Sequence, residues 1–151
     1  MIRKFLISDA CACSQIINEC HKSMPELGEP ELKFLLQKYT PQYLAEEYLK
    51  NFVLVFEEDE KILGVGSLLM ENAEIRGLYI DPAAQNKGIG SQLLTRLEQE
   101  AKNRGLKKVI TNAYFQPEKF YANRGYEYVQ KGSHKKCDAT FNYVVMEKSL
   151  E

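Results

Sequence analysis

The chain has 151 residues, of which 44% are apolar and 27% are charged, and its formal net charge is −1. These values predict one globular domain, residues 1–151, with one hydrophobic core that buries about two-thirds of the surface of the unfolded chain. A net charge so close to zero produces no strong field, so neither a nucleic-acid partner nor an anionic membrane partner is expected.

Membrane-spanning and secretory segments are not expected either. The longest apolar stretches, such as residues 62–70, are much shorter than the roughly 20 residues that cross a bilayer. The apolar residues 5–7, which follow Arg3 and Lys4, are too few for a signal peptide. We therefore predict a cytoplasmic location.

The four cysteines are Cys11, Cys13, Cys20 and Cys137. In a reducing compartment they are expected to be free thiols. Cys11, Cys13, Cys20 and His21 do not predict a metal site, because Cys11 and Cys13 point to different faces of the helix expected there. We expect no metal, and we interpret the cysteines as small buried hydrophobes.

The first third of the chain predicts one strand followed by helices. Residues 2–6 read as a strand, and Ser8 or Asp9 is a suitable N-cap for a helix that runs to about Cys20. Residues 24–51 are interrupted by prolines and carry apolar residues at helical spacing, which predicts two short helices.

The middle of the chain predicts three consecutive antiparallel strands. Residues 52–57 and 62–70 form the strands of a hairpin, with a polar turn at 58–61, and residues 73–80 continue the meander.

After Asp81 and Pro82, apolar residues at helical spacing predict a helix from about Ile89 to near Gly105. A strand at 109–113 follows.

The end of the chain predicts a short helix at 117–123 and strands at 126–130 and 140–147. The whole order of elements indicates an α/β fold with a mixed sheet.

The loop between residue 80 and the helix from Ile89 has the features of a phosphate-binding turn. Gly88 and Gly90 precede and open the helix, whose N-terminus offers unpaired N–H groups, and Lys87 adds a cation. A lone Gly-x-Gly is a weak signal. A dinucleotide fingerprint would need a third glycine where Leu93 stands, and Gly-Lys-Ser/Thr, which ends the nucleoside-triphosphate loop, does not occur.

Two segments carry a family resemblance. Residues 85–90, Gln-Asn-Lys-Gly-Ile-Gly, resemble the Q/R-x-x-G-x-G/A motif of the GNAT superfamily of N-acetyltransferases, and residues 120–127 resemble its F-Y-x-x-x-G-F/Y-E segment. Asn112 also resembles the Asn that this family places nine residues before the tyrosine of that segment. The resemblance covers about residues 50–147.

The resemblance implies a GNAT-like, mixed and mostly antiparallel sheet of about six or seven strands, flanked by helices on both faces and splayed between the fourth and fifth strands. It also implies acetyl-CoA as the acetyl donor, with the pantetheine arm along the fourth strand, the diphosphate on the N–H groups of residues 86–91, and a backbone amide near Leu78 polarising the acetyl carbonyl. The residues expected to bind the cofactor are Leu78, Tyr79, Ile80, Gln85, Asn86, Lys87, Gly88, Ile89, Gly90, Ser91, Asn112 and Tyr121.

Tyr121 is the candidate general acid, because a phenol with a pKa near 10 is protonated at neutral pH and can protonate the departing thiolate. The alternative is that Tyr121 only packs beside Phe120. Asn112 would contact the cofactor arm or a water, or would simply cap the end of a strand.

Glu74 is the candidate base, acting directly or through water, because a substrate ammonium must lose its proton before it attacks. Its even offset from Leu78 places both on one face of the strand. The alternative is a solvated glutamate near a turn.

Two weaker features concern the acceptor and the cofactor. His134 would titrate near neutrality or touch the adenosine 3′-phosphate, but we interpret its segment as a solvated loop between the last two strands. Several glutamates near the expected acceptor cleft suggest a cationic acceptor, although such residues also serve solubility; they are Glu26, Glu29, Glu31, Glu46 and Glu47.

The predicted function is therefore that of an enzyme, an acetyl-CoA-dependent N-acetyltransferase. It transfers acetyl directly from the thioester to a primary amine of a small molecule, peptide or protein. The alternatives are a non-catalytic acetyl-CoA-binding or regulatory module, and an acyltransferase that uses another acceptor. A homodimer is a further expectation, because dimers are common in proteins of this type.

Overall fold

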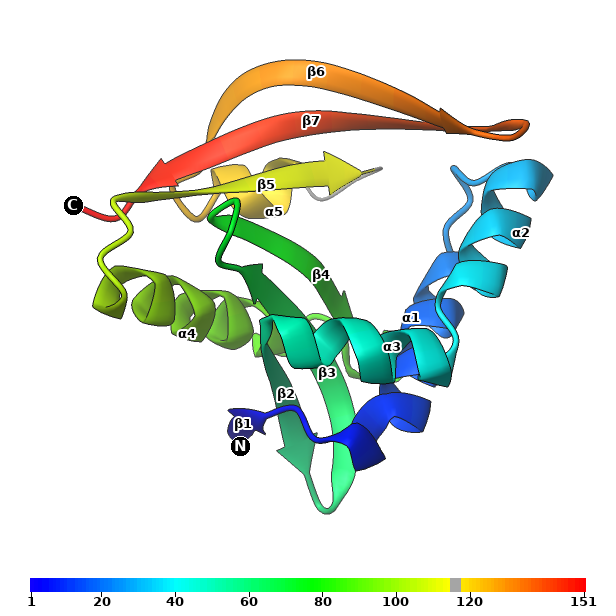
Figure 1. Cartoon of the computed structure of the whole chain (residues 1–151), viewed down its shortest axis with the longest axis horizontal. Helices are drawn as coiled ribbons and strands as arrows, with labels where there is room; N and C mark the ends of the chain where they lie inside the picture. Colours follow the sequence, from blue (N-terminus) through cyan, green and yellow to red (C-terminus); the bar gives the residue numbers. More distant parts are fainter. Residues whose placement is uncertain (115–117) are drawn as a thin grey trace.

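The computed structural model describes residues 1–114 and 118–151. In these ranges seven strands form one sheet in the order β1-β2-β3-β4-β5-β7-β6 (Figure 1). The strands are β1 (Ile2–Lys4), β2 (Phe52–Glu58), β3 (Lys61–Leu69), β4 (Glu74–Ile80), β5 (Lys108–Tyr114), β6 (Glu127–Lys136) and β7 (Ala139–Ser149). The α-helices are α1 (Ala10–Lys22), α2 (Glu29–Lys38), α3 (Pro41–Glu47), α4 (Ile89–Asn103) and α5 (Glu118–Ala122).

The sheet is antiparallel except between its fourth and fifth strands. β4 and β5 run parallel and pair at only two positions, Glu74 with Ile110 and Ile75 with Thr111. Beyond these pairs the two strands diverge toward their C-terminal ends (Figure 1). The predicted fold class is confirmed, including the seven-stranded mixed sheet and the splay.

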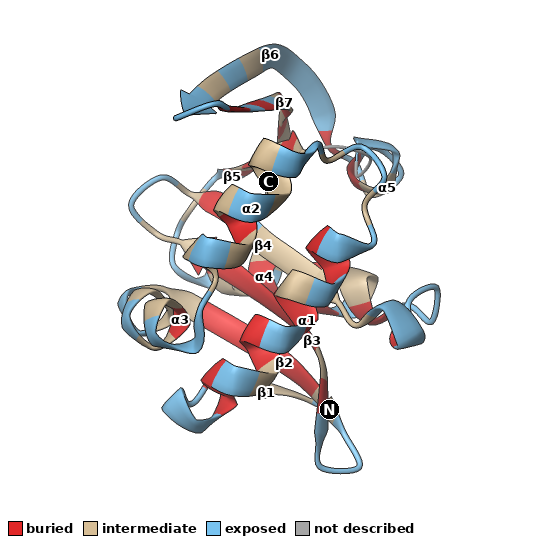
Figure 2. Ribbon diagram, turned by 90° about the vertical axis from the view of Figure 1, so that its right-hand side faces the viewer, coloured by how far each residue is buried: buried red, intermediate tan, exposed pale blue. Residues whose placement is uncertain are grey.

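Helices cover both faces of the sheet because successive apolar side chains of the central strands point alternately to one face and to the other. In β2, Leu54 belongs to the core beneath α4, whereas Val53 and Val55 belong to the core beneath α1. Figure 2 shows β2 and β3 as a buried centre, while β6 at the edge of the sheet is mostly exposed. The sheet therefore separates an α4 side from an α1 side.

A bulge in β4 changes which side chains share a face. Val65 pairs with Tyr79 and Ser67 pairs with Arg76, so Gly77 and Leu78 stand opposite the single residue Gly66. Gly77 adopts the left-handed region with φ of 65°, which glycine enters without steric cost.

The bulge corrects the expectation that Glu74 and Leu78 lie on the same face. The Leu78 side chain lies beside Leu97 of α4, where both would contact a Cβ on Gly66. Ile75 also packs in the α4-side core, so its neighbour Glu74 points to the α1 side. The prediction was wrong because the extra residue shifts the alternation by one position.

The last hairpin corrects the interpretation of His134. Residues 126–130 and 140–147 were expected as short strands with a loop between them, but β6 and β7 extend until they meet at Cys137 and Asp138. His134 lies within β6, paired with Phe141, and is half-buried. The loop prediction was wrong because cross-strand pairing sustains strand structure in a segment whose polar composition is typical of loops.

The short helix expected at 117–123 is α5, Glu118–Ala122; the predicted first residue, Pro117, lies outside the described residues.

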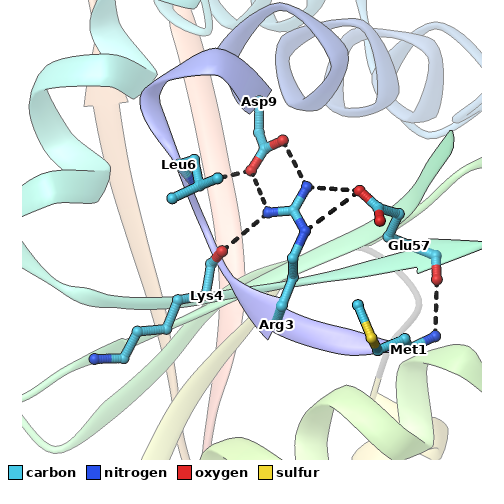
Figure 3. A network of polar contacts seen from close by, with 6 residues as sticks. All are labelled: Met1, Arg3, Lys4, Leu6, Asp9 and Glu57. Atoms are coloured by element: carbon cyan, nitrogen blue, oxygen red, sulfur yellow. Dashed lines mark hydrogen bonds and ion pairs between the residues drawn. The ribbon is translucent and has the colours of Figure 1, made fainter. Parts of the chain in front are cut away.

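An ion-pair network joins the N-terminal strand to the rest of the fold (Figure 3). The Arg3 guanidinium donates to both carboxylate oxygens of Asp9, at 2.8 and 2.9 Å, and to Glu57 Oε1 at 2.7 Å. The Leu6 N–H also donates to Asp9. The Arg3 hydrogen bonds hold the pKa of Asp9 below its usual value. This network fixes β1 and the start of α1 against β2.

All four cysteines are free thiols, as expected. Cys13 is buried and Cys11 exposed, so they do lie on different faces of α1. The interpretation as buried hydrophobes holds for Cys13 and Cys20 but is wrong for Cys11 and Cys137, which are exposed. Within residues 1–114 and 118–151, no group of three or more potential metal ligands is found, and none of the helices has the length and apolarity needed to cross a membrane.

Candidate active site

A cavity of about 730 Å³ extends along the line where β4 and β5 separate. At one end it reaches the N-terminus of α4; we call this the turn end, formed by Asn86, Gly88, Gly90, Ser91 and Arg124. At the other it reaches α2 and the β6–β7 hairpin; we call this the hairpin end, formed by Lys38, Tyr39, Arg76, Tyr114 and His134.

The turn end is a helix N-terminus shaped by glycine. Gly88 is the N-cap of α4 and adopts φ of 82°, a left-handed conformation that is costly for other residues. A Cβ built on Gly88 would meet no heavy atom within 4 Å, so the space before the helix is open. The first N–H groups of α4 have no partners within the helix and carry its positive end, which suits an anion such as a diphosphate.

Arg124 adds a cation to the turn end. Its Nε donates to Ser91 Oγ at 3.1 Å, and its guanidinium carbon lies 3.7 Å from the centroid of the Phe120 ring. Sequence reasoning missed this residue as a separate candidate, although it lies within the segment 120–127 that carries the resemblance. Lys87, the expected local cation, is exposed and is not among the residues that line the cavity.

β4 borders the cavity at Leu78, Tyr79 and Ile80. Strand pairing with β5 ends at Ile75, so this edge of β4 faces the cavity rather than a neighbouring strand. The Ile80 carbonyl is already engaged, because it accepts hydrogen bonds from Cys20 Sγ at 3.0 Å and from Gln85 Nε2 at 3.2 Å.

Tyr121 and Asn112 reach the cavity from α5 and β5. Tyr121 is only 6% exposed and contacts Phe120 edge-on, so it packs beside Phe120 as well as lining the cavity. Burial raises the pKa of its phenol, against a smaller lowering from a hydrogen bond with Thr111. Asn112 pairs with Val145 inside β5, which shows that it does not cap the end of the strand.

Glu74 lies at the point where β4 and β5 begin to separate, and it is 4% exposed. Both of its carboxylate oxygens accept hydrogen bonds from Arg76, from Nε at 2.9 Å and from Nη2 at 3.0 Å. These hydrogen bonds raise the pKa of Arg76. The alternative interpretation of Glu74 as a solvated glutamate is therefore wrong, because Glu74 is a buried member of an ion pair whose partner was not predicted.

Aromatic rings form the walls of the hairpin end. His134 Nε2 lies 3.2 Å from the Tyr114 hydroxyl, and the His134 ring packs on Phe141 with centroids 5.3 Å apart. Nearby, His21 Nε2 lies 3.0 Å from the Tyr79 hydroxyl. Burial, and then the charge of Lys38, lower the pKa of His21 to about 4, so its imidazole is neutral at pH 7.

The structure thus brings almost all predicted site residues into one cavity. Of the residues expected to bind the cofactor or to take part in catalysis, Lys87 alone is absent from its lining. The residues that sequence reasoning missed come mainly from the hairpin end, notably Lys38, Arg76 and Tyr114.

A splayed mixed sheet with a glycine turn at the edge of the splay is the architecture of acetyltransferases of the GNAT type. Residues 23–150 match the family model described as "Acetyltransferase (GNAT) domain", and the chain belongs to this family.

The chain also shares its fold with solved structures, and part of it is similar to curated sequences. The chain is similar to a GCN5-related N-acetyltransferase from Rhodopseudomonas palustris, with a TM-score of 0.91, 21% identity and coverage of 99% of this chain and 94% of that one. It is also similar to the PaiA N-acetyltransferase of Thermoplasma acidophilum in complex with coenzyme A, with a TM-score of 0.79, 21% identity and coverage of 99% and 98%. The uncharacterized protein YdhI of Bacillus subtilis is 31% identical over 83 residues, 53% of this chain. The match spans about half of that relative's length, 51%.

Proposed function

We propose that this protein is an acetyl-CoA-dependent N-acetyltransferase that transfers acetyl directly to a primary amine. The observation that carries the proposal is the single cavity in which the glycine turn of α4, the unpaired edge of β4 and the buried Tyr121 phenol meet. Acetyl transfer needs a positioned thioester, stabilisation of the carbonyl oxygen and a proton for the leaving thiolate, and this cavity has a candidate for each.

The donor side of the proposal rests on the turn end. The N–H groups of residues 86–91 and the cation of Arg124 would hold the diphosphate, and backbone groups of Leu78 and Tyr79 would pair with the pantetheine arm. Asn112 would contact the same arm from β5. The similar PaiA enzyme was solved in complex with coenzyme A, which supports this choice of donor.

In the proposed reaction Tyr121 is the general acid. Its raised pKa keeps the phenol protonated at neutral pH, and the thiolate it would protonate has a conjugate acid with a pKa near 8.5. Proton transfer from Tyr121 would therefore prevent the thiolate from attacking the new amide.

Glu74 is the proposed proton acceptor for the substrate ammonium, directly or through a water molecule. It is the carboxylate at the start of the splay, and Arg76 fixes its orientation through two hydrogen bonds. The proton must leave because an ammonium has no lone pair with which to attack the thioester.

Direct transfer, rather than an acyl-cysteine intermediate, is favoured by the state of Cys20. Cys20 is the cysteine that lines the described cavity, and burial raises the pKa of its thiol to about 11. A cysteine that remains a thiol at neutral pH is a poor nucleophile.

The proposal is tested by calorimetric titration with acetyl-CoA and by thiol release against a panel of primary amines. We expect binding of acetyl-CoA and amine-dependent thiol release. In Tyr121→Phe we expect kcat to fall about 100-fold with acetyl-CoA binding retained, because only the acid is lost.

Tyr128→Phe is the matched control, since Tyr128 is 59% exposed and does not line the cavity. Binding of acetyl-CoA without thiol release for any amine would identify a non-catalytic binding module instead. Absence of binding would contradict the proposal altogether.

A further inference from the structure

The hairpin end of the cavity contains a cation that has no ion-pair partner in the described chain. Lys38, the last residue of α2, is half-buried, and its ammonium lies over the rings of Tyr39 and Tyr43, 5.3 and 5.8 Å from their centroids. Among the described residues, no carboxylate lies within ion-pair distance of it. Glu47, which is near enough to act on the Lys38 charge, is ion-paired with Lys50 at 3.2 Å.

A second cation faces the same space. Arg76 uses Nε and Nη2 for Glu74, and its Nη1 forms no hydrogen bond with any described residue. The Arg76 side chain is 56% exposed although it borders the cavity. Burial lowers the pKa of Lys38, and the next largest contribution comes from the charge of Arg76, so the two cations interact.

The charges at this end do not balance. Lys38 and Arg76 each contribute one positive charge and Glu74 one negative charge, which leaves about one positive charge facing the cavity. Lys136, on the neighbouring hairpin, adds to the positive side but is exposed and screened by solvent. A half-buried cation without a counter-ion is stabilised when a ligand supplies the anion.

The acidic residues noted in the sequence do not supply that anion. Of the five glutamates, only Glu26 lines the cavity, and it is exposed. Glu31 accepts a hydrogen bond from the Thr140 N–H and ties α2 to the hairpin (Figure 1). The suggestion of a cationic acceptor therefore rests on Glu26 alone among these five residues.

We propose that Lys38 and Arg76 form a subsite for a carboxylate of the acceptor, so that the substrate class is an amine that also carries a carboxylate, as amino acids do. The inference rests on the proposed N-acetyltransferase function and assigns its acceptor. The ammonium of such a zwitterion would face the carboxylate of Glu74, while its carboxylate would face the cations of Lys38 and Arg76.

The test uses wild-type protein, acetyl-CoA and amino acids that are each compared with their carboxamide and with the decarboxylated amine, and it includes O-phosphoethanolamine. We expect at least one amino acid to have a kcat/KM at least 10-fold above that of its carboxamide. In Lys38→Met this ratio is expected to fall to about one through a higher KM for the amino acid, while the Kd for acetyl-CoA stays within twofold.

Lys33→Met is the matched control, because Lys33 lies on the same helix but is exposed and outside the cavity lining. Equal use of amino acids and carboxamides, or a preference for the phosphorylated amine, would overturn the carboxylate subsite and leave the enzyme proposal intact. The same holds if Lys38→Met weakens acetyl-CoA binding as much as acceptor use. No reaction with any amine would instead overturn the proposed function, and the acceptor subsite with it.

Discussion

The two ends of the cavity are built in different ways. The turn end comes mostly from one continuous segment, residues 85–91, and it offers backbone N–H groups at a helix N-terminus. The hairpin end comes from side chains of α2, β4, β5 and β6, which are far apart in the sequence. The comparison suggests that a shared donor can be held by local backbone geometry, whereas the choice of acceptor depends on side chains that only tertiary packing brings together.

The largest effect is expected from placing a negative charge at the turn end. In Gly88→Glu the new carboxylate would stand before the open helix N-terminus. Its repulsion with one negative phosphate charge about 5 Å away costs about 3 kcal/mol at an effective dielectric of about 20. We expect acetyl-CoA binding to weaken at least about 1,000-fold by calorimetry, since a diphosphate carries about two such charges.

Gly105→Glu is the matched control for this variant. Gly105 also has a left-handed φ, 85°, and no heavy atom within 4 Å of a built Cβ, so both variants introduce similar backbone strain. Comparable loss of binding in the two variants would contradict the assignment of the turn end to the donor.

The second effect concerns pH and the buried His21 beside Tyr79. The unfolded chain binds a proton at this histidine near pH 6.5, but the folded chain does so only near pH 4, so folding stability falls as the pH drops through this window. The loss attributable to His21 is about 3 kcal/mol between pH 7 and pH 4.

Urea unfolding of the wild type and of His21→Gln at several pH values measures the contribution of His21 to the pH dependence of the free energy of unfolding. The variant is expected to lose less stability on acidification than the wild type over this range. Parallel stability curves for the two proteins would show that His21 is not protected from protonation in the folded state.

A smaller effect is expected in the Arg3 network, whose residues Arg3, Asp9 and Glu57 do not line the cavity. Arg3→Met leaves the buried Asp9 carboxylate with only the Leu6 N–H, and we expect the free energy of unfolding to fall by about 1–2 kcal/mol. Lys22→Met, which removes an exposed ion pair with Glu19, should cost less than about 0.5 kcal/mol. A change in acetyl-CoA affinity in Arg3→Met would mean that the network affects the cavity after all.

The smallest effect concerns the contribution of Arg124 to acetyl-CoA binding at the turn end. Arg124→Gln removes the cation beside Ser91, and we expect the Kd for acetyl-CoA to rise about fivefold, which corresponds to about 1 kcal/mol. Arg104→Gln serves as control, since Arg104 pairs with Glu100 on the surface of α4. An unchanged Kd in Arg124→Gln would leave the backbone N–H groups as the sole source of phosphate affinity.

Much of the fold was predictable because its elements have strong local signals. The apolar spacing of α4, the apolar runs of β2 and β3, and the Gly88 turn are visible in short windows of sequence. The strand character of β6 was not, because its residues are polar and exposed and its pairing with β7 depends on contacts across the hairpin. The bulge at Gly77 was missed, because a glycine inside a strand often marks a bulge but does not reveal which residues pair around it.

The sequence by itself determined the order of the elements, the glycine turn and the resemblance to GNAT acetyltransferases, because helix periodicity, apolar strand runs and turn chemistry are local properties. Only the tertiary structure decided that Glu74 is bound to Arg76 on the face opposite Leu78, and that Lys38 and His134 meet in the same cavity. The physical reason is that such ion pairs and pockets depend on strand register and helix packing, which join residues separated by long stretches of chain.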